Sequence, residues 1–180
     1  GRYEYVTIKY SASDGSQRWV ARYTYNGGTE RPAAIAVDNA GGVYVTGYSY
    51  IYPSDHCDYA TVKYNAADGS QIWVARYDDI GEDDLAYAIA VDNAGGVYVT
   101  GYSYVSGGIY DFVTVKYDAA GNQQWVVTYN GPGNYVDAAT AIAVDNAGGI
   151  YVTGSSTGPG TLTDYATRKY NAADGSQVWV

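Results

Sequence analysis

The 180-residue sequence has no methionine and only one cysteine, one histidine and one phenylalanine. The single Cys57 cannot form an internal disulfide bond, and it fits either redox compartment or a bridge to another chain. No apolar run approaches the roughly 18 residues that a membrane-spanning helix requires, so no membrane span is expected. Because methionine is absent and the first residues already lie within a repeated pattern, we expect an excerpt or a processed piece of a longer chain.

Basic residues are also scarce, with 10 Lys and Arg against 19 Asp and Glu and a formal net charge of −9. Binding to nucleic acid or to an anionic membrane needs a basic face, so neither partner is expected. Cations, basic proteins and neutral sugars stay open as partners, and an acidic surface also simply keeps a protein soluble. Tyr and Gly are abundant at 23 each, and with the many Val and Thr they predict an all-β protein.

Two phrases alternate along the chain. The first reads Ala-Ile-Ala-Val-Asp-Asn-Ala-Gly-Gly, continues to Tyr-Val-Thr-Gly, and begins at Ala34, Ala88 and Ala141. The second is rich in aromatic residues and ends in Trp-Val, with its tryptophans at Trp19, Trp73, Trp125 and Trp179. These tryptophans are separated by 54, 52 and 54 residues, so the chain is a tandem array.

Each unit of the array reads as four strands. The apolar run at 34–37 predicts a first strand, and an Asp-Asn-Ala-Gly-Gly turn leads to a second strand at 43–48. The third strand, at 59–64, is joined to the fourth, at 71–77, by a second tight turn. Since the chain starts with a third strand and ends with a fourth, the pattern predicts 14 strands.

A repeat of this length with four antiparallel strands is typical of a β-propeller blade, although a stacked β-solenoid is a rival. The predicted organisation is a half blade at 1–25 followed by blades at about 33–77, 87–129 and 139–180. Propellers close with roughly four to eight blades, so about three and a half blades cannot close by themselves. Further repeats of a longer chain, other copies of the chain, or an open array with adhesive ends would each be consistent with this.

The phrases Asp58 to Tyr64, Ile72 to Tyr77 and Ala88 to Gly101 resemble the beta-propeller repeat called SBBP, and the resemblance recurs in every unit. That family occurs in large bacterial proteins that are often secreted or attached to the cell surface. The resemblance implies the fold and an extracellular or cell-surface location, but no reaction. More distantly, the Asp-Gly-Ser-Gln-x-Trp turn resembles quinoprotein propellers, without a matching cofactor-site pattern.

The four connections of a unit are not equally variable. The turns between first and second strands and between third and fourth strands are near copies, whereas the other two connections differ from unit to unit. In an up-and-down blade the variable connections emerge at one end, and loops on a rigid scaffold often carry binding residues. Drift in unconstrained loops is the alternative. The tyrosines there predict a lectin-like surface, and the candidate binding residues are Tyr50, Tyr52, Asp55, Tyr104 and Tyr110.

The loop at 78–84 packs five carboxylates into seven residues. Hard cations such as Ca²⁺ bind six to eight oxygen atoms, and a glycine allows the loop to bend, so calcium is the one candidate cofactor. The candidate ligands are Asp78, Asp79, Glu82, Asp83 and Asp84. A solvated acidic loop is the alternative, and a pair of these carboxylates acting in glycoside hydrolysis would need a separation that sequence does not show.

His56 and Cys57 are adjacent, but neighbours on an extended strand point to opposite faces, which argues against a nucleophilic pair. The recurring tryptophans predict packing between blades. Each third strand carries a lysine and follows an acid, so we expect the acids to meet a Lys or Arg near the blade edge. The lysines are Lys9, Lys63, Lys116 and Lys169, and the acids are Glu4, Asp58, Asp111 and Asp164.

Together these patterns predict a non-catalytic, extracellular or cell-surface propeller scaffold for adhesion or self-assembly. One alternative is a lectin-like or protein-binding module that uses the variable loops. Another is a propeller enzyme of lyase or quinoprotein type, although no constellation of residues demands it. The expected partners are other copies of the chain, further repeats of a longer chain, or a glycan.

Overall fold

The computed structural model describes residues 3–51, 53, 56–79, 81–160 and 163–179. Over these residues the chain forms strands and turns without a helix, which confirms the all-β prediction. None of them forms a helix of the length and apolarity that a membrane crossing demands. The strands are β1 (Tyr5–Tyr10), β2 (Gln17–Tyr23), β3 (Thr29–Val37), β4 (Gly42–Ile51), β5 (His56–Asn65), β6 (Gln71–Tyr77), β7 (Asp84–Val91), β8 (Val97–Ser106), β9 (Ile109–Tyr117), β10 (Gln123–Tyr129), β11 (Ala138–Val144), β12 (Gly149–Thr157), β13 (Thr163–Asn171) and β14 (Gln177–Trp179).

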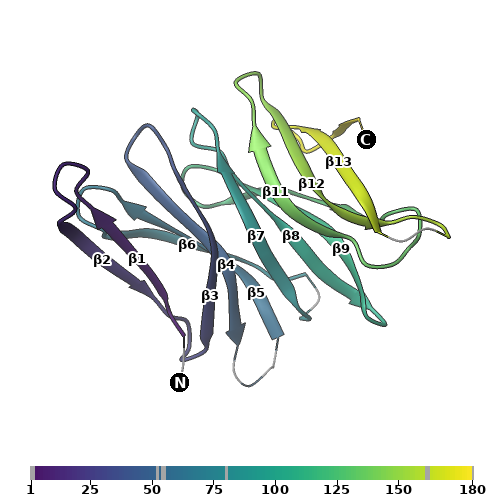
Figure 1. The fold of residues 1–180 in the computed structure, drawn as a ribbon, viewed down its shortest axis with the longest axis horizontal. Helices are drawn as coiled ribbons and strands as arrows, with labels where there is room; N and C mark the ends of the chain where they lie inside the picture. Colours follow the sequence, from purple (N-terminus) through teal and green to yellow (C-terminus); the bar gives the residue numbers. More distant parts are fainter. Residues whose placement is uncertain (1–2, 52, 54–55, 80, 161–162, 180) are drawn as a thin grey trace.

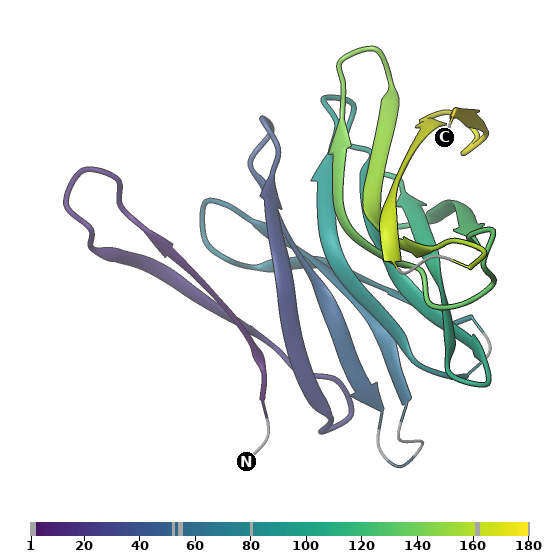
Figure 2. The ribbon, with the colours of Figure 1, turned by 45° about the vertical axis from the view of Figure 1, so that its right-hand side comes forward.

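The strands form one two-stranded sheet, β1–β2, and three four-stranded sheets, β3–β6, β7–β10 and β11–β14. All pairings between neighbouring strands are antiparallel and follow the chain order. Figure 1 shows the sheets side by side as wedges of an open fan, with β1–β2 at one side and the last sheet at the other. Figure 2 shows the same two sheets well apart, so the fan does not close on itself.

The turn between the first and second strands is held by an aspartate that caps its own loop. In the β7–β8 turn, Asp92 Oδ1 accepts the backbone N–H groups of Ala94 and Gly96 at 2.9 and 2.7 Å. Its other oxygen accepts the hydroxyl of Tyr98 at 2.8 Å. Gly95 takes a φ of 86°, which favours glycine. Equivalent bonds at Asp38 and Asp145 explain why this phrase repeats almost unchanged.

The first strand of each four-stranded sheet is longer than the apolar run that predicts it. For example, β7 begins at Asp84 rather than at Ala88. The pairing with β8 shifts register between Ala86 and Ala88, and β3 and β11 have the same bulge at the same place. A bulge interrupts the alternation of side chains, so the part of the strand before it does not continue the apolar pattern.

The buried side chains form three clusters, and each cluster lies between two consecutive sheets. In each cluster the earlier sheet contributes mainly Tyr, Phe and Trp, whereas the later sheet contributes mainly Val, Ile and Ala. At each of the three joints the earlier sheet therefore presents an aromatic face and the later sheet an aliphatic face. Because no sheet buries its faces alone, the stability of each depends on its neighbours.

Candidate functional site

At each of the three joints between sheets, a tryptophan and a lysine of the earlier sheet donate hydrogen bonds to one backbone carbonyl oxygen of the later sheet. At the joint between β3–β6 and β7–β10, Trp73 Nε1 donates to the carbonyl oxygen of Ala119 at 3.1 Å, and Lys63 Nζ donates to it at 3.4 Å. Trp73 and Lys63 are paired on neighbouring strands, and Ala119 lies in the β9–β10 turn. We call this arrangement the clasp. It recurs from Trp19 and Lys9 to Ala66, at 3.0 and 2.6 Å, and from Trp125 and Lys116 to Ala172, at 3.2 and 2.6 Å.

The indole of each clasp also packs on a glycine of the same turn. A Cβ atom on Gly121 would lie 2.8 Å from the ring of Trp73, and Gly121 has a φ of 88°. The position therefore favours glycine both for its backbone angle and for the space taken by the indole. Gly69 and Gly175 have the same relation to the preceding tryptophans. These contacts confirm that the recurring tryptophans of the first three sheets pack between blades.

A tyrosine of the third strand adds a further contact across two of the joints. Tyr59 is fully buried, and its hydroxyl donates to the carbonyl oxygen of Val113 in the next sheet at 3.3 Å. Tyr5 is equally buried and donates to the carbonyl oxygen of Ala60 at 3.1 Å. At the third joint Phe112 occupies this position, 1% exposed. A buried aromatic ring at this position is therefore part of every joint, with or without a hydroxyl.

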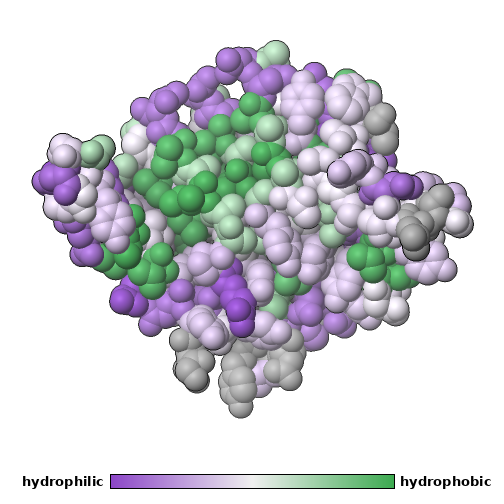
Figure 3. All heavy atoms as spheres, viewed as in Figure 1, coloured by the Kyte–Doolittle hydropathy of each residue, from purple (hydrophilic) through white to green (hydrophobic). Residues whose placement is uncertain are grey.

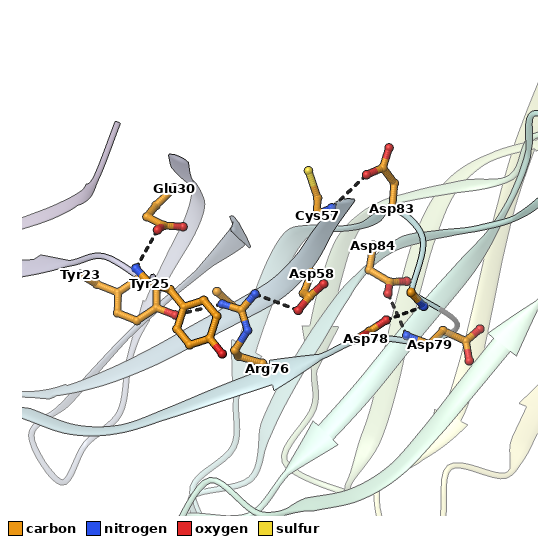
Figure 4. A network of polar contacts seen from close by, with 12 residues as sticks. Tyr23, Tyr25, Glu30, Cys57, Asp58, Arg76, Asp78, Asp79, Asp83 and Asp84 are labelled. Carbon is orange, nitrogen blue, oxygen red and sulfur yellow. Dashed lines mark hydrogen bonds and ion pairs between the residues drawn. The ribbon is translucent and has the colours of Figure 1, made fainter. Parts of the chain in front are cut away.

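Two of the acids that precede the lysines, Glu4 and Asp58, pair with arginine rather than with lysine. Asp58 accepts Arg76 Nη2 at 2.8 Å within one sheet, and Arg76 Nη1 donates to the hydroxyl of Tyr23 in the preceding sheet at 3.2 Å (Figure 4). Glu4 and Arg22 form the corresponding pair at 2.8 Å. The expected ion pairing is confirmed for these two acids, and the lysines belong to the clasp instead.

Asp111 has no such arginine, because Thr128 stands at the position that corresponds to Arg76. Its Oδ1 is buried and has no hydrogen-bond donor among the residues that the structure describes. Burial, together with the nearby carboxylate of Asp137, raises the pKa of the Asp111 carboxyl to about 6. The β7–β10 sheet therefore carries a half-buried carboxyl group whose charge is not compensated.

The two ends of the sheets differ. In Figure 1 the near-identical turns lie along the upper end, and the connections that vary between units lie along the lower end. These variable connections join β2 to β3, β4 to β5, β6 to β7, β8 to β9, β10 to β11 and β12 to β13. We call this end the variable rim. It contains the candidate cation ligands and those candidate binding tyrosines that the structure describes, Tyr50, Tyr104 and Tyr110.

Each four-stranded sheet buries one carboxylate at the variable rim, four residues before its apolar run. The three carboxylates are Glu30, Asp84 and Asp137, all 0–1% exposed. Each accepts a backbone N–H of the loop that precedes it, from Tyr25 at 2.8 Å, Asp79 at 2.9 Å and Gly131 at 2.6 Å respectively. Burial raises the pKa of the Asp84 carboxyl to about 6. These side chains fasten the rim loops, and sequence reasoning missed their common role although their spacing from the apolar run is constant.

Three of the remaining carboxylates of the acidic loop have separate protein partners, and Figure 4 shows Asp78 and Asp83 apart from each other. Asp78 accepts the N–H of Gly81 at 2.8 Å, Asp83 accepts the N–H of Cys57 at 3.0 Å, Glu82 lies 3.7 Å from His56 Nδ1, and Asp79 is exposed. Among the described residues, no group of three or more His, Cys, Asp or Glu side chains is placed to hold a metal ion. The calcium site stays a prediction of the sequence.

Cys57 and His56 lie in different surroundings although they are neighbours in β5. Cys57 is 2% exposed, and burial together with the charge of Asp83 raises the pKa of its thiol to about 12. His56 is half-exposed and lies toward Glu82. This agrees with the expectation that adjacent residues of a strand face opposite sides. A buried thiol that is protonated at neutral pH is a poor nucleophile.

Four tyrosines of the β7–β10 sheet form a continuous cluster at the variable rim, which we call the tyrosine cluster. The ring of Tyr102 lies 5.3 Å from that of Tyr87 and 4.9 Å from that of Tyr110, and Tyr104 lies 5.4 Å from Tyr110. The hydroxyls of Tyr87 and Tyr102 are 3.2 Å apart. Sequence reasoning singled out Tyr104 and Tyr110 but missed Tyr87, because it lies in the bulge of β7, directly before the repeated phrase begins.

Of the other candidate rim residues, Tyr50 lies in the neighbouring sheet. Tyr50 is 39% exposed at the end of β4. Tyr52 and Asp55 lie outside the described residues. Of the five candidate binding residues, the structure therefore brings two rings together, in the tyrosine cluster, and places a third on an adjacent sheet.

Four-stranded antiparallel sheets that stack face to face, joined by the same contacts each time, are the arrangement of propeller blades. Residues 124–160 match the SBBP family, a beta-propeller repeat. The SBBP segment runs from β10 through β11 and β12, so it extends from one blade into the next. No curated protein matches the chain. The SBBP match and the stacked sheets identify the chain as a propeller-type scaffold.

Proposed function

We propose that the chain is a non-catalytic, extracellular or cell-surface scaffold that acts in adhesion or self-assembly through the outer faces of its first and last sheets. The location is supported by the resemblance to SBBP repeats, which occur in secreted and surface-attached proteins. The assembly role is supported by the exposure of side chains that are buried at every other joint. No residue in the described part of the chain needs to act as an acid, base or nucleophile for this role.

The observation that carries the proposal is the exposure of Tyr165. Its counterparts in the preceding sheets, Tyr5, Tyr59 and Phe112, are at most 1% exposed, whereas Tyr165 is 97% exposed. Trp179 beside it is 43% exposed, compared with 8% for Trp19. The aromatic face of the last sheet therefore presents to solvent the groups that elsewhere form a joint.

The opposite end of the array is apolar as well. Val6 and Ile8 in β1 are 42% and 39% exposed, whereas their counterparts in the next sheet are fully buried. In the adjacent sheet, Ile35 and Val37 of β3 are 61% and 67% exposed, and Figure 3 shows an apolar area that extends over β3, β7 and β11. Extended apolar patches on a protein surface are typical of interaction sites.

The proposal is tested by measuring the mass of the protein by light scattering over a range of concentrations. We expect concentration-dependent association, because each end of the array exposes apolar side chains that a partner would bury. Tyr165→Asp should reduce it. Ile72→Asp is the matched control, because Ile72 is 52% exposed but lies on a middle sheet. A protein that stays monomeric at every concentration would contradict the assembly role, and surface labelling of cells that produce the protein tests the location.

The tyrosine cluster favours a second function, a lectin-like or protein-binding surface at the variable rim. Stacked and edge-on aromatic rings with hydroxyl groups present both apolar and hydrogen-bonding surface to a ligand. Binding on a glycan array that is lost in Tyr104→Ala and Tyr110→Ala, and kept in Ile72→Ala, would support this function. An array without signal for the unchanged protein would count against it.

A further inference from the structure

We infer that two copies of the chain join head to tail, with the last sheet of one copy clasping the β1–β2 sheet of the next as each blade clasps its neighbour. This inference rests on the proposed self-assembly and specifies its partner and its register. It follows from a comparison of the two end sheets with the three joints inside the chain.

The last sheet presents the donor half of a joint. Trp179 and Lys169 are paired on β14 and β13, as Trp73 and Lys63 are paired on β6 and β5. Within the described residues, neither reaches a carbonyl of a following turn. Lys169 lies over the ring of Tyr151 at 4.9 Å, as the clasp lysines lie over the corresponding tyrosines at 5.0 and 5.5 Å. The ring of Trp179 lies 6.1 Å from that of Tyr151, as the ring of Trp73 lies 5.9 Å from that of Tyr44. Both donors are therefore arranged as in a formed clasp, while Lys169 Nζ also lies 3.9 Å from Asp145 Oδ2.

The β1–β2 sheet presents the acceptor half. The carbonyl that corresponds to those of Ala66, Ala119 and Ala172 belongs to Ala12, and no described tryptophan or lysine donates to it. Gly15 corresponds to the glycines that carry an indole, and a Cβ atom placed on it would meet nothing within 4 Å. Its φ of 69° is close to the 75° of Gly69 and the 73° of Gly175. The platform for an indole is present, and none of the described indoles covers it.

A two-stranded sheet provides every polar contact of this joint, while at the internal joints the second strand of the later sheet also packs apolar side chains. The clasp, the indole packing and the tyrosine hydroxyl bond all involve third strands, fourth strands and the turns between them. β1 and β2 are a third and a fourth strand, and they already form a complete joint with the β3–β6 sheet through their aromatic face. Their aliphatic face, with Val6 and Ile8, lies on the other side and corresponds to the face that receives a preceding blade.

The donor groups of the last sheet complement the acceptor groups of the β1–β2 sheet, but neither sheet complements a second copy of itself. A symmetric contact between two last sheets would place Lys169 and Trp179 against the same donors and provide no carbonyl acceptor. A symmetric contact between two first sheets would bring carbonyl groups together without a donor. In a heterologous contact the last sheet of one copy meets the first sheet of another, so that the tryptophan and lysine donors and the carbonyl acceptor all form hydrogen bonds.

The internal joints also predict the register of the contact. Trp179 Nε1 and Lys169 Nζ of one copy donate to the carbonyl of Ala12 in the other, with the indole over Gly15. The hydroxyl of Tyr165 donates to the carbonyl of Val6, which corresponds to the acceptor positions of Ala60 and Val113. Val6 and Ile8 then become buried, as their counterparts are.

Complementary variants test the direction of assembly. Tyr165→Asp blocks the last sheet and Val6→Asp blocks the first, and both sites are exposed, so each variant should keep its circular dichroism spectrum. If Val6→Asp does not fold, Gly15→Leu blocks the same sheet. We expect each variant alone to be monomeric and an equimolar mixture to form a dimer, because each supplies the intact half that the other lacks.

Three results would overturn this inference. Self-association of the Val6→Asp variant together with a monomeric Tyr165→Asp variant would indicate a symmetric contact between last sheets. Association that neither substitution weakens would place the interface away from both end sheets, and would overturn the proposed self-assembly through those faces as well. A mixture of the two variants that stays monomeric, when the unchanged protein associates, would exclude a head-to-tail contact. Trp179→Phe should weaken association about fivefold, as expected for one hydrogen bond.

Discussion

The indole of Trp19 lies against the α-carbon of Gly69, so that a Cβ atom at that position would be 2.8 Å from the ring. The two residues belong to different sheets and lie 50 positions apart in the sequence. Gly15 occupies the same place in its own turn, with the same kind of backbone angle, but has no neighbour within 4 Å of such a Cβ atom. Substitutions at Gly15 and Gly69 therefore distinguish two effects on stability. Both strain the backbone of the turn, and only the one at Gly69 also disturbs the packing of an indole at a joint.

We predict that Gly69→Ala lowers the free energy of unfolding more than Gly15→Ala does. Both substitutions place alanine at a positive φ and carry a backbone cost of roughly 1 kcal/mol. Only the change at Gly69 also displaces the ring of Trp19, and overpacking of this kind costs about 1–3 kcal/mol more. Urea unfolding followed by fluorescence measures both values. Equal losses would show that the joint does not depend on this contact.

A second prediction concerns the hydrogen bond of the clasp. Trp125→Phe removes the donor to the carbonyl of Ala172 and should lower the free energy of unfolding by about 1 kcal/mol, plus a contribution from the smaller ring. Trp179→Phe is the matched control, since Trp179 is 43% exposed and donates to no carbonyl of a following turn in the described chain. At concentrations where the protein is monomeric, Trp179→Phe should have little effect. A comparable loss in both variants would contradict the role of the clasp.

Thr128→Arg should stabilise the protein, because it supplies the ion pair that Asp111 lacks. The new guanidinium would reach Asp111 as Arg76 reaches Asp58, and the gain should be roughly 1 kcal/mol for a partly exposed pair. The melting temperature measures the effect, and Thr128→Gln, with a long but neutral side chain, is the control. An equal gain in both variants would assign the effect to packing rather than to charge.

The raised pKa values of Asp84 and Asp111 predict that stability falls as pH rises between about 4 and 6. Both carboxyls ionise near pH 3.8 when unfolded and near 6 when folded, so in this range the folded state binds more protons and raising the pH favours unfolding. The turn aspartates Asp38 and Asp145 have lowered pKa values, so their contribution changes only at lower pH. Asp111→Asn should flatten the slope of melting temperature against pH from 4 to 6. An unchanged slope would contradict the assignment.

Cys57 should be inert in the folded protein. Because its thiol is buried and has a pKa of about 12, almost none of it is thiolate at pH 8. A colorimetric thiol reagent should therefore react with the unfolded protein within minutes and with the native protein only as fast as it opens. Rapid reaction of the native protein, or a disulfide-linked dimer in the absence of reductant, would contradict the burial of this residue.

Most of the fold could be predicted from the sequence because its determinants are local and repeated. The turn held by Asp92 and the glycine at positive φ recur in every unit, and they fix the strands on either side. The tryptophans mark the fourth strands at a constant phase. The start of β7 was less predictable, because the strand begins at Asp84, before the bulge at Tyr87, and the regular alternation begins only after the bulge.

The roles of charged residues were harder to predict, because they depend on partners in other units. Lys63 follows Asp58 closely in the sequence, yet its donor reaches Ala119, 56 residues away, while Asp58 pairs with Arg76. The equivalence of Glu30 and Asp84 is difficult to recognise in the sequence, because the two residue types differ. Both nevertheless lie four residues before the apolar run of their unit, and both are buried. The exposure of Tyr165 depends on what lies against the last sheet, and the repeat itself contains no such information.

The donors of every clasp lie on one unit and the acceptor on the next, so the array has a polarity that is the same at each joint. A unit that is duplicated, deleted or exchanged within the gene would still meet a compatible neighbour on both sides. The number of blades can thus change by recombination without any new contact having to evolve. The rim loops remain free to diverge, since only the buried carboxylate that fastens each of them must be kept.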